Sequence, residues 1–486
     1  MKRKNILGVL LIFGLIFGHL LKLKGQTSNL KIQAAKEDRQ LTMPWRNCIA
    51  IGRAHNLLRA DILEQLEYAQ KIIGYSYCRF HAIFDDEMDV VRRDKKTGKL
   101  IFQWHHVDKV YDALLKLGIR PFVELNPMPA VMASGTQTMF AYKMNVTPPK
   151  SCNEWEYLVE SFTRHLVERY GFDEVKNWYF EVWNEPNLPG FWSGTQEDYW
   201  KLYTASAKAI KRVDEKLRVG GPASSKANWI KEIITYTTRN KIPLDFISTH
   251  LYPQDEQVEF PDRKGSPHKV GDFFSATVKE VQQMVEKSER PDIEIHWTEW
   301  NTQSTATADK ITWGENVYVD NLFAASFIVR NFVEIDNYCK TFAYWVVSDI
   351  FDEGVIPQSP FSCTYGLLTI HGIPKASFNA FRLLRKMTGT IMDVKTQASI
   401  PSGKGILVTK DKQTIKMLLW NQNFVEEKEH TNWTGTVDIP TVNDSLLNSV
   451  SATIGLGSGS PWESWQFMGR PLNPTSAQLE LLKQHS

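Results

Sequence analysis

Two glutamates stand out because similar residues surround both of them. Glu185 belongs to the segment WNEPN, which closes the apolar run Trp178–Trp183, and Glu299 belongs to WTEWN. Each carboxylate therefore stands where a predicted buried strand gives way to a loop, and Pro186 fixes the turn after the first. Splitting a glycosidic bond requires two carboxyl groups, one that protonates the leaving oxygen and one that stabilises the cationic sugar carbon. The two segments therefore predict glycosidase chemistry.

The surroundings of the two glutamates assign them different roles. Tryptophan and proline beside Glu185 favour a desolvated, protonated carboxyl that acts first as acid and then as general base. Glu299 is then the ionised nucleophile, with Tyr252 as a hydrogen-bond donor. A single glutamate at a strand end more often binds loop amides or an arginine, and the matched pair of segments is what favours catalysis.

The length and composition of the chain fit a globular enzyme. Its 486 residues exceed one small core and predict one large domain with a lesser one. Hydrophobic residues make up 42% and charged residues 23%, as in ordinary soluble proteins. The net charge of +2 is spread along the chain, so no nucleic-acid partner is predicted. The 16 tryptophans favour a carbohydrate ligand, because indole faces stack on sugar rings.

Beyond residue 45, short β-branched or aromatic runs alternate with longer stretches of helical periodicity. The predicted strands are Cys48–Ile51, Tyr77–Phe84, Arg120–Leu125, Trp178–Trp183, Arg218–Gly221, Phe246–His250, Glu294–Thr298 and Phe342–Val347. The predicted helices are Ile62–Ile73, Val107–Leu117, Trp155–Tyr170, Asp198–Val213, Ser275–Glu289, Asn316–Val333 and Phe378–Met387. This α/β series predicts a (β/α)8 barrel over residues 26–388, with catalytic groups at the C-terminal ends of the strands. A doubly wound open sheet is the rival fold, and the lack of a glycine-rich loop after the first strand disfavours it.

Other polar residues also fall at predicted strand ends. His81 and His250 stand there, where an imidazole either binds a sugar hydroxyl or is simply hydrogen-bonded in the core. Trp345 is expected to form a platform under the sugar ring rather than to fill the core. Glu124 ends the third strand and either lines the pocket or is structural. Glu181 points inward lower in the barrel and is predicted to be structural.

The N-terminus has the plan of a secretory signal. Basic residues in Met1–Lys4 precede the apolar run Ile6–Leu21. Lys22 and Lys24 make a poor cleavage region, so residues 1–25 are either a signal peptide or an uncleaved anchor, and we expect export to the periplasm or the medium. The five cysteines are odd in number and lack metal spacing, so mostly free thiols and no metal are predicted.

After about Gly389 the pattern changes to short alternating runs separated by turns. The predicted strands are Gly405–Val408, Ile415–Trp420, Gly435–Ile439 and Ser449–Ile454. They predict a small antiparallel β-sandwich domain over residues 389–486.

Five segments resemble glycoside hydrolase family 39, which contains β-xylosidases and α-L-iduronidases. They are Arg79–His81, Ile119–Glu124, Asn145–Lys150, Phe180–Asn187 and Tyr344–Trp345. The resemblance runs from about residue 51 to about residue 482 and is strongest with the bacterial β-xylosidases. Asn-Glu-Pro alone is shared by many barrel glycosidases, whereas the whole series in order is specific.

The resemblance implies a barrel with an accessory β-sandwich, retention of anomeric configuration and no metal or organic cofactor. It carries Glu185 over as acid/base and Glu299 as nucleophile. It implies that Asn184 binds the 2-hydroxyl of the sugar, where contacts tighten in the transition state. Further contacts to the terminal sugar are implied for His81, His250, Tyr252, Trp345, Asp349 and Glu353.

Two features depart from the family pattern. The polar loop Gln254–Gly271 carries Lys264 and Lys269, and a cation there could hold the carboxylate of a uronic acid. The chain also stops at Ser486, before the further sandwich strands of family xylosidases. We therefore expect a sandwich closed by fewer strands, or an open edge prone to association.

The sequence thus predicts an exported, exo-acting, retaining β-xylosidase that acts on xylo-oligosaccharides or related glycosides. The first alternative is a family enzyme for another terminal sugar, such as an α-L-arabinopyranoside or an α-L-iduronide. The second is a catalytically silent carbohydrate-binding barrel, which the presence of both glutamates disfavours. Association into a homo-oligomer stays open.

Overall fold

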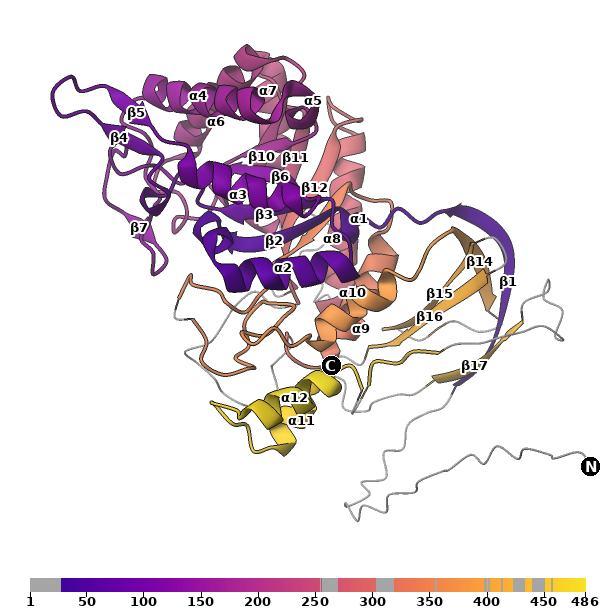
Figure 1. Ribbon diagram of the computed structural model, residues 1–486. Coiled ribbons are helices and arrows are strands. Elements are labelled where there is room, and N and C mark those ends of the chain that lie inside the picture. The colour runs from indigo at the N-terminus through magenta and orange to yellow at the C-terminus, as the bar shows by residue number, and fades with distance from the viewer. Residues whose placement is uncertain are drawn as a thin grey trace, which may run out of the picture.

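The chain folds into a barrel of strands and helices with a smaller sheet beside it (Figure 1). This computed structural model describes residues 28–253, 255, 270–302, 319–354, 356–396, 400, 403–411, 414–422, 433–438, 451–455 and 458–486. The predicted N-terminal signal and most of the polar loop Gln254–Gly271 therefore lie outside the described residues.

Eight parallel strands close the barrel in the order β10-β11-β12-β13-β2-β3-β6-β9. Their bounds are β2 Cys48–Arg53, β3 Tyr77–His81, β6 Arg120–Leu125, β9 Tyr179–Val182, β10 Arg218–Ser224, β11 Phe246–His250, β12 Glu294–Trp300 and β13 Thr341–Tyr344. Each strand overlaps one of the eight predicted runs. The predicted (β/α)8 barrel is confirmed, and its closure rules out the open sheet.

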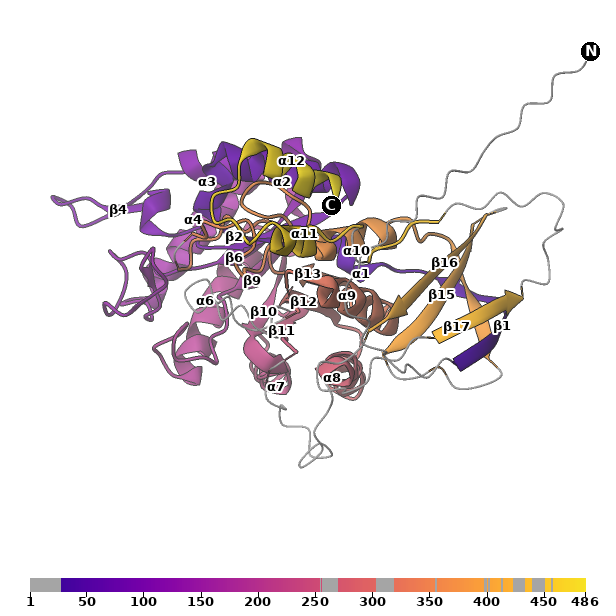
Figure 2. The same cartoon turned by 90° about the horizontal axis from the view of Figure 1, so that it is seen from below.

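Helices surround the barrel and cover the outer faces of its strands (Figure 2). The longer ones are α2 Ala60–Ile72, α3 His105–Lys116, α4 Cys152–Tyr170, α6 Gln196–Val213, α7 Ile230–Asn240, α8 Val270–Glu286, α9 Leu322–Ile335 and α10 Ala376–Leu384. The start of α6 shows why the sequence turns helical there, since Thr195 and Asp198 form a reciprocal capping box. Short elements that the sequence analysis did not predict include β4 Val91–Arg93, β5 Leu100–Phe102, β7 Thr138–Met139 and β8 Met144–Asn145.

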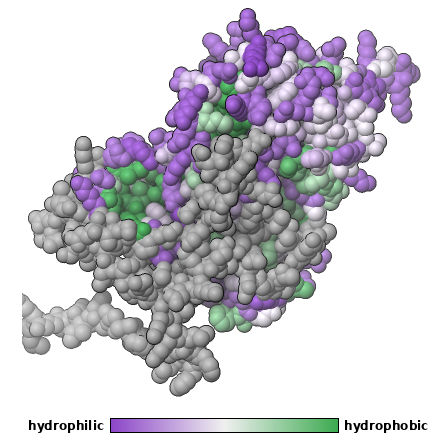
Figure 3. Space-filling view, turned by 180° about the vertical axis from the view of Figure 1, so that it is seen from behind, coloured by the Kyte–Doolittle hydropathy of each residue, from purple (hydrophilic) through white to green (hydrophobic). Residues whose placement is uncertain are grey.

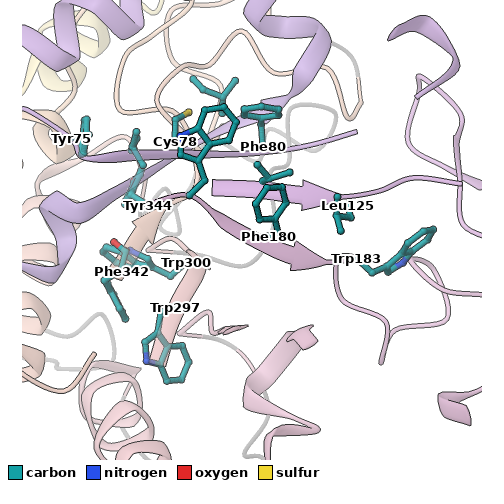
Figure 4. Close-up of a cluster of buried hydrophobic side chains, with 14 of the residues drawn as sticks. Tyr75, Cys78, Phe80, Leu125, Phe180, Trp183, Trp297, Trp300, Phe342 and Tyr344 are labelled. Carbon is teal, nitrogen blue, oxygen red and sulfur yellow. The ribbon is translucent and has the colours of Figure 1, made fainter. Parts of the chain in front are cut away.

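Successive residues of the barrel strands point alternately to two interiors. On β3, Cys78 and Phe80 belong to the large core shared with the helices (Figure 4). Tyr77 packs against a separate cluster inside the barrel. That inner cluster closes the floor of the barrel and consists of Cys48, Phe122, Tyr179, Phe246 and Ala343. Residues two or four positions further along a strand share the inner face, so Arg79 and His81, which follow Tyr77 on β3, lie inside the barrel toward its C-terminal mouth.

The smaller sheet has five strands in the order β16-β15-β14-β1-β17. Its strands are β1 Ser28–Gln40, β14 Thr390–Thr396, β15 Lys404–Asp411, β16 Thr414–Asn421 and β17 Trp433–Asp438. The predicted domain boundaries need correction here, because β1 precedes the barrel in sequence yet pairs antiparallel with β14 and parallel with β17. The accessory unit thus combines both ends of the chain, which no local pattern in residues 389–486 could reveal.

The last part of the chain is helical rather than the predicted sandwich. α11 Pro461–Phe467 and α12 Ser476–Gln484 pack through Trp465 and Leu482 onto Phe361, which follows β13. Of the predicted strand Ser449–Ile454, residues 451–454 are not in a strand, and the first two residues lie outside the described range.

Polar side chains cover much of the described surface in Figure 3, and apolar ones form smaller patches. The five cysteines are free thiols, as expected. Among the described residues no helix combines the length and the apolar character needed to cross a membrane.

Candidate active site

The two glutamates singled out by the sequence meet inside the mouth of the barrel. One carboxylate oxygen of Glu185, one of Glu299 and one ring nitrogen of His250 all lie within 4.8 Å of one another. Both carboxyl groups are largely buried, with 6% and 7% exposure. Retaining glycosidases hold their two carboxyls about 5–5.5 Å apart, whereas inverting enzymes need about 6.5–9.5 Å. The close approach of one oxygen from each carboxyl therefore fits the shorter, retaining arrangement, in which one carboxylate attacks the sugar directly.

Glu185 is brought inward by a sharp turn at the end of β9. Trp183 and Glu185 both have positive φ, 72° and 44°, so the alternation of the strand breaks. The indole of Trp183 then packs outside the barrel against Trp155 and Trp192. The backbone N–H of Glu185 donates to the carbonyl of Ala223 at 2.8 Å, which ties the turn to β10.

Burial sets the proton affinity of Glu185. Desolvation raises its pKa to about 7, although a hydrogen bond from Ser225 and the charge of Arg79 work in the opposite direction. Nδ1 of His250 lies 3.0 Å from Oε1 of the same carboxyl. A carboxyl with such a pKa holds its proton near neutral pH, as a proton donor requires.

Glu299 lies on β12 and receives donors on both oxygens. The hydroxyl of Tyr252 donates to its Oε1 at 2.5 Å, and the guanidinium of Arg79 lies 3.4 Å from its Oε2. Both contacts direct hydrogen-bond donors at the carboxylate that has to attack as the nucleophile. The predicted contact between Tyr252 and Glu299 is present.

Arg79 is the residue of the site whose position the sequence analysis did not explain. It is fully buried on β3 and contacts Glu181 at 2.6 Å and Glu124 at 2.7 Å. Its Nη2 also donates to Oδ1 of Asn184 at 2.8 Å, which fixes the orientation of that amide. The available signal was its spacing, two residues before His81 on one strand and hence on the same inner face. Glu181 is buried and accepts from Arg79 and Thr298, and its predicted structural role stays a prediction.

Two polar atoms at the site have no partner among the described residues. They are Nδ2 of Asn184 and Nε2 of His250, both buried. A buried polar atom without a partner is costly, so beside the two carboxyls a ligand can lower that cost by completing the hydrogen bonding. Asn184 and His250 were both predicted to bind the sugar, and that role stays a prediction, with these unpaired atoms as the groups that could donate or accept.

A second group of side chains lies beside Glu299 and consists of His81, Trp345 and Glu353. Nε2 of His81 lies 3.9 Å from Oε2 of Glu299 and 3.8 Å from Oε1 of Glu353. The ring of Trp345 lies 4.5 Å from the imidazole of His81. Burial raises the pKa of Glu353 well above its usual range, and the charges of Glu299 and Glu185 add to this. The structure thus brings all three predicted residues to the carboxylate pair.

Asp349 is placed differently from the prediction. It is 1% exposed, and its carboxylate lies 2.7 Å from Nζ of Lys375 and accepts from the backbone N–H of Gly366 at 2.8 Å. Lys375 also contacts Asp320 at 2.5 Å. The position of Asp349 after β13 predicted a place at the barrel mouth. In the structure its carboxylate is instead buried in an ion pair with Lys375. These contacts correct the predicted role in sugar binding.

A cleft of about 290 Å³ adjoins the turn that carries Glu185. Pro186, Asn187, Trp192, Gln196, Trp229 and Gln137 contribute to its lining. Asn187 joins the cleft to the site, because its side chain exchanges two hydrogen bonds with the backbone of Ser225, whose side chain binds Glu185.

The same cluster also has the composition of a possible metal site. Among the described residues, Glu185, His250 and Glu299 are the one group of histidine, cysteine and acidic side chains close enough to bracket an ion. The two-carboxyl reaction uses these groups directly, and the absence of a metal cofactor stays a prediction.

Comparison with known proteins agrees with this geometry. Residues 28–486 match the family model described as glycosyl hydrolases family 39. A β-xylosidase of Caldicellulosiruptor saccharolyticus is 39% identical over 383 residues, covering 78% of this chain and 75% of that protein. A β-xylosidase of Geobacillus stearothermophilus is 32% identical over 447 residues, covering 90% and 85%.

A solved structure is similar over nearly the whole chain. The crystal structure of a monomeric β-xylosidase from Caulobacter crescentus CB15 superimposes with a TM-score of 0.80 at 28% identity, covering 94% of this chain and 92% of that one. Fold, carboxylate pair and sequence relatives thus agree, and the chain belongs to glycoside hydrolase family 39.

Proposed function

We propose that this glycoside hydrolase removes terminal β-D-xylosyl residues from xylo-oligosaccharides or related glycosides with retention of configuration. The observation that carries the proposal is the separation of at most 4.8 Å between oxygens of Glu185 and Glu299, which suits a double displacement. The two bacterial β-xylosidases at 39% and 32% identity support xylose as the sugar.

In the first step Glu299 attacks the anomeric carbon while Glu185 protonates the glycosidic oxygen. Tyr252 and Arg79 hold Glu299 in place and stabilise its charge before the attack. The free Nδ2 of Asn184 is positioned to donate to the 2-hydroxyl, a contact that strengthens as the sugar flattens toward the transition state. The first step leaves a covalent glycosyl-enzyme on Glu299.

In the second step Glu185, now ionised, removes a proton from water, which attacks the anomeric carbon and releases the sugar. The leaving group has to depart on the side of Glu185, and the cleft beside Pro186 and Asn187 lies there. We assign that cleft to the remainder of the oligosaccharide, with the half-buried indole of Trp229 as a stacking surface.

One alternative sugar has an observation in its favour. An α-L-iduronidase of Mus musculus is 23% identical over 468 residues of alignment, covering 84% of this chain. The loop residues Lys264 and Lys269, proposed to hold a uronic-acid carboxylate, lie outside the described residues. The higher identity to the xylosidases makes the uronide the second candidate.

A panel of aryl glycosides tests the proposal, with the wild type and Glu299→Ala assayed side by side. We expect the highest kcat/KM on the β-D-xylopyranoside and lower values on the α-L-arabinopyranoside, β-D-glucopyranoside and α-L-iduronide. The variant should be inactive on all four. Preference for the iduronide would move the enzyme to the alternative sugar. Failure of the wild type on every substrate would favour a silent carbohydrate-binding barrel.

A further inference from the structure

Glu124 is a buried carboxyl next to the catalytic pair, and the reaction described so far gives it no role. It lies at the end of β6 with 1% exposure. Its Oε2 lies 2.7 Å from Nη2 of Arg79, and its two oxygens lie 2.9 Å and 2.8 Å from Nδ1 of His81. The carboxyl thus bridges the cation that supports Glu299 and an imidazole that faces Glu299.

The charges around Arg79 do not balance if every carboxyl is ionised. Glu124, Glu181 and Glu299 all contact its guanidinium, and in the described part of the chain their ion pairs run otherwise only to His81 and His250. Burial lowers the pKa of His81 to about 3 and that of His250 to about 4, so both rings are neutral near pH 7. One positive charge then faces three buried carboxyls, and a buried charge without a partner is strongly unfavourable.

The hydrogen bonds indicate which carboxyl holds a proton. Glu181 accepts from Arg79 at 2.6 Å and from Thr298 at 2.8 Å, so it is well stabilised as an anion. Burial is the largest influence and opposes that charge, but Arg79, His250 and Ser248 together outweigh it and the pKa of Glu181 falls. Glu299 has Tyr252 and Arg79 and must be ionised to attack. For Glu124, burial is the dominant effect and raises its pKa well above the usual range, although Arg79 opposes this.

The two nitrogens of His81 lead to the same assignment. If Glu124 were ionised, Nδ1 of His81 would carry the ring proton, and the lone pair of Nε2 would face carboxyl oxygens of Glu299 and Glu353 at 3.9 Å and 3.8 Å. If Glu124 is neutral, its O–H donates to Nδ1, and Nε2–H faces those oxygens instead. The short contact between Glu124 and Nδ1 pairs a donor with an acceptor in both arrangements, but only the second turns an N–H rather than a lone pair toward the ionised Glu299.

We propose that Glu124 is a carboxylic acid that donates to Nδ1 of His81, so that His81 presents Nε2–H to the nucleophile Glu299 and to the sugar bound beside it. Glu124 is a positioning residue, because it acts through the imidazole and through Arg79. The inference rests on the proposed function for the role of Glu299, but the protonation state itself can be measured without substrate.

The decisive variant is Glu124→Gln, because a glutamine amide has the hydrogen-bonding pattern of the neutral acid. Its oxygen can accept from Arg79 at the place of Oε2, and its NH2 can donate to Nδ1 of His81 at the place of Oε1. We expect kcat/KM on the best aryl glycoside to stay within about fivefold of wild type. Glu124→Leu, of similar size but without donor or acceptor, should lose about 100-fold or more. A loss of that size in Glu124→Gln, with an unchanged melting temperature, would overturn the proposal.

An infrared difference spectrum at pH 7 tests the proton directly. Subtracting the spectrum of folded Glu124→Gln from that of the wild type should leave the carbonyl band of a protonated carboxyl, since other protonated groups cancel. A carboxylate band in its place would refute the inference. If the wild type cleaves no glycoside but this carboxylic-acid band is present, the proposed function fails while the assignment of the proton stands.

Discussion

Two buried clusters at the C-terminal end of the barrel each surround one cation, and they differ in what they leave unsatisfied. Lys375 contacts Asp320 and Asp349 and donates to the carbonyl of Thr364 at 3.0 Å. Backbone N–H groups of Cys363 and Gly366 complete the two carboxylates at 2.8 Å each. Although burial opposes the charge of Lys375, Asp320 and Asp349 raise its pKa.

The Arg79 cluster has one cation for three carboxyls, and it includes polar atoms without partners. Nδ2 of Asn184 and Nε2 of His250 are buried without a partner among the described residues. The other polar atom of each side chain is bound at the site, Nδ1 of His250 at 3.0 Å from Glu185 and Oδ1 of Asn184 by Arg79. In the Lys375 cluster the two carboxylate oxygens without a hydrogen bond, Oδ1 of Asp320 and Oδ2 of Asp349, still contact the ammonium of Lys375. The unpaired atoms of Asn184 and His250 have no such ionic partner among the described residues, so a ligand can still complete them. Burial and charge alone therefore do not distinguish a catalytic cluster from a structural one, but the balance of donors and acceptors does.

The strongest test of this contrast removes the nucleophile. Glu299→Gly should lower kcat/KM by about 10⁴-fold, or roughly 5.5 kcal/mol of transition-state stabilisation, because no covalent intermediate can form. Added azide should restore turnover of an aryl xyloside and give a glycosyl azide of inverted configuration, as determined by NMR of the product.

The matched control is Glu185→Ala, in which Glu299 still forms the intermediate. Azide should then give a glycosyl azide of retained configuration. An inverted azide from Glu185→Ala, together with no rescue of Glu299→Gly, would exchange the roles of the two residues.

The sequence was sufficient for those parts of the site that follow from periodicity. Strand ends predicted the barrel mouth, and the repeated Trp–Glu–Asn surroundings predicted Glu185 and Glu299. The spacing of Arg79 from His81 also indicated an inward-facing position, but an arginine on a strand is usually a surface residue. Its burial became intelligible only when three carboxyls from β6, β9 and β12 were seen around it.

Long-range pairing was beyond the reach of sequence patterns. The strand β1 joins the accessory sheet across more than 350 residues of chain, with Gln33 opposite Lys395, and its local pattern gives no partner. Asp349 was misassigned for a related reason. Position after a strand places a residue near the mouth, but the path of the loop decides whether its side chain meets a sugar or Lys375.

The Lys375 cluster should respond to mutation in stability rather than in catalysis. Lys375→Met leaves two buried carboxylates without their cation, and we expect a loss of about 3–5 kcal/mol in the free energy of unfolding. Lys340→Met is the control, because Lys340 is 56% exposed and its ion pair with Glu294 is 3.6 Å long, so the loss should stay below about 1 kcal/mol. Denaturant unfolding measures both.

At a temperature where Lys375→Met is folded, its kcat/KM should stay within about twofold of wild type. Asp349→Asn tests the same distinction at the carboxylate itself, since it should lower the melting temperature and leave KM unchanged. A rise in KM without a change in melting temperature would restore Asp349 as a sugar contact and remove the distinction between the two clusters.

The smallest expected effect concerns the pH dependence of kcat/KM, in which the alkaline decline should depend on the Arg79 cluster and not on the Lys375 cluster. Burial raises the pKa of Glu185 to about 7, and the acid form is the one that protonates the leaving group. The group therefore carries its proton below pH 7 and loses it above, so kcat/KM should be flat on the acid side of this pKa and fall about tenfold per pH unit on the alkaline side. Glu185→Gln, assayed on an aryl xyloside with a good leaving group, should lose the alkaline limb, whereas Lys375→Met should keep it unchanged. An alkaline limb that survives in Glu185→Gln would assign the titration to another group, and a limb displaced by Lys375→Met would mean that the two clusters are electrostatically coupled.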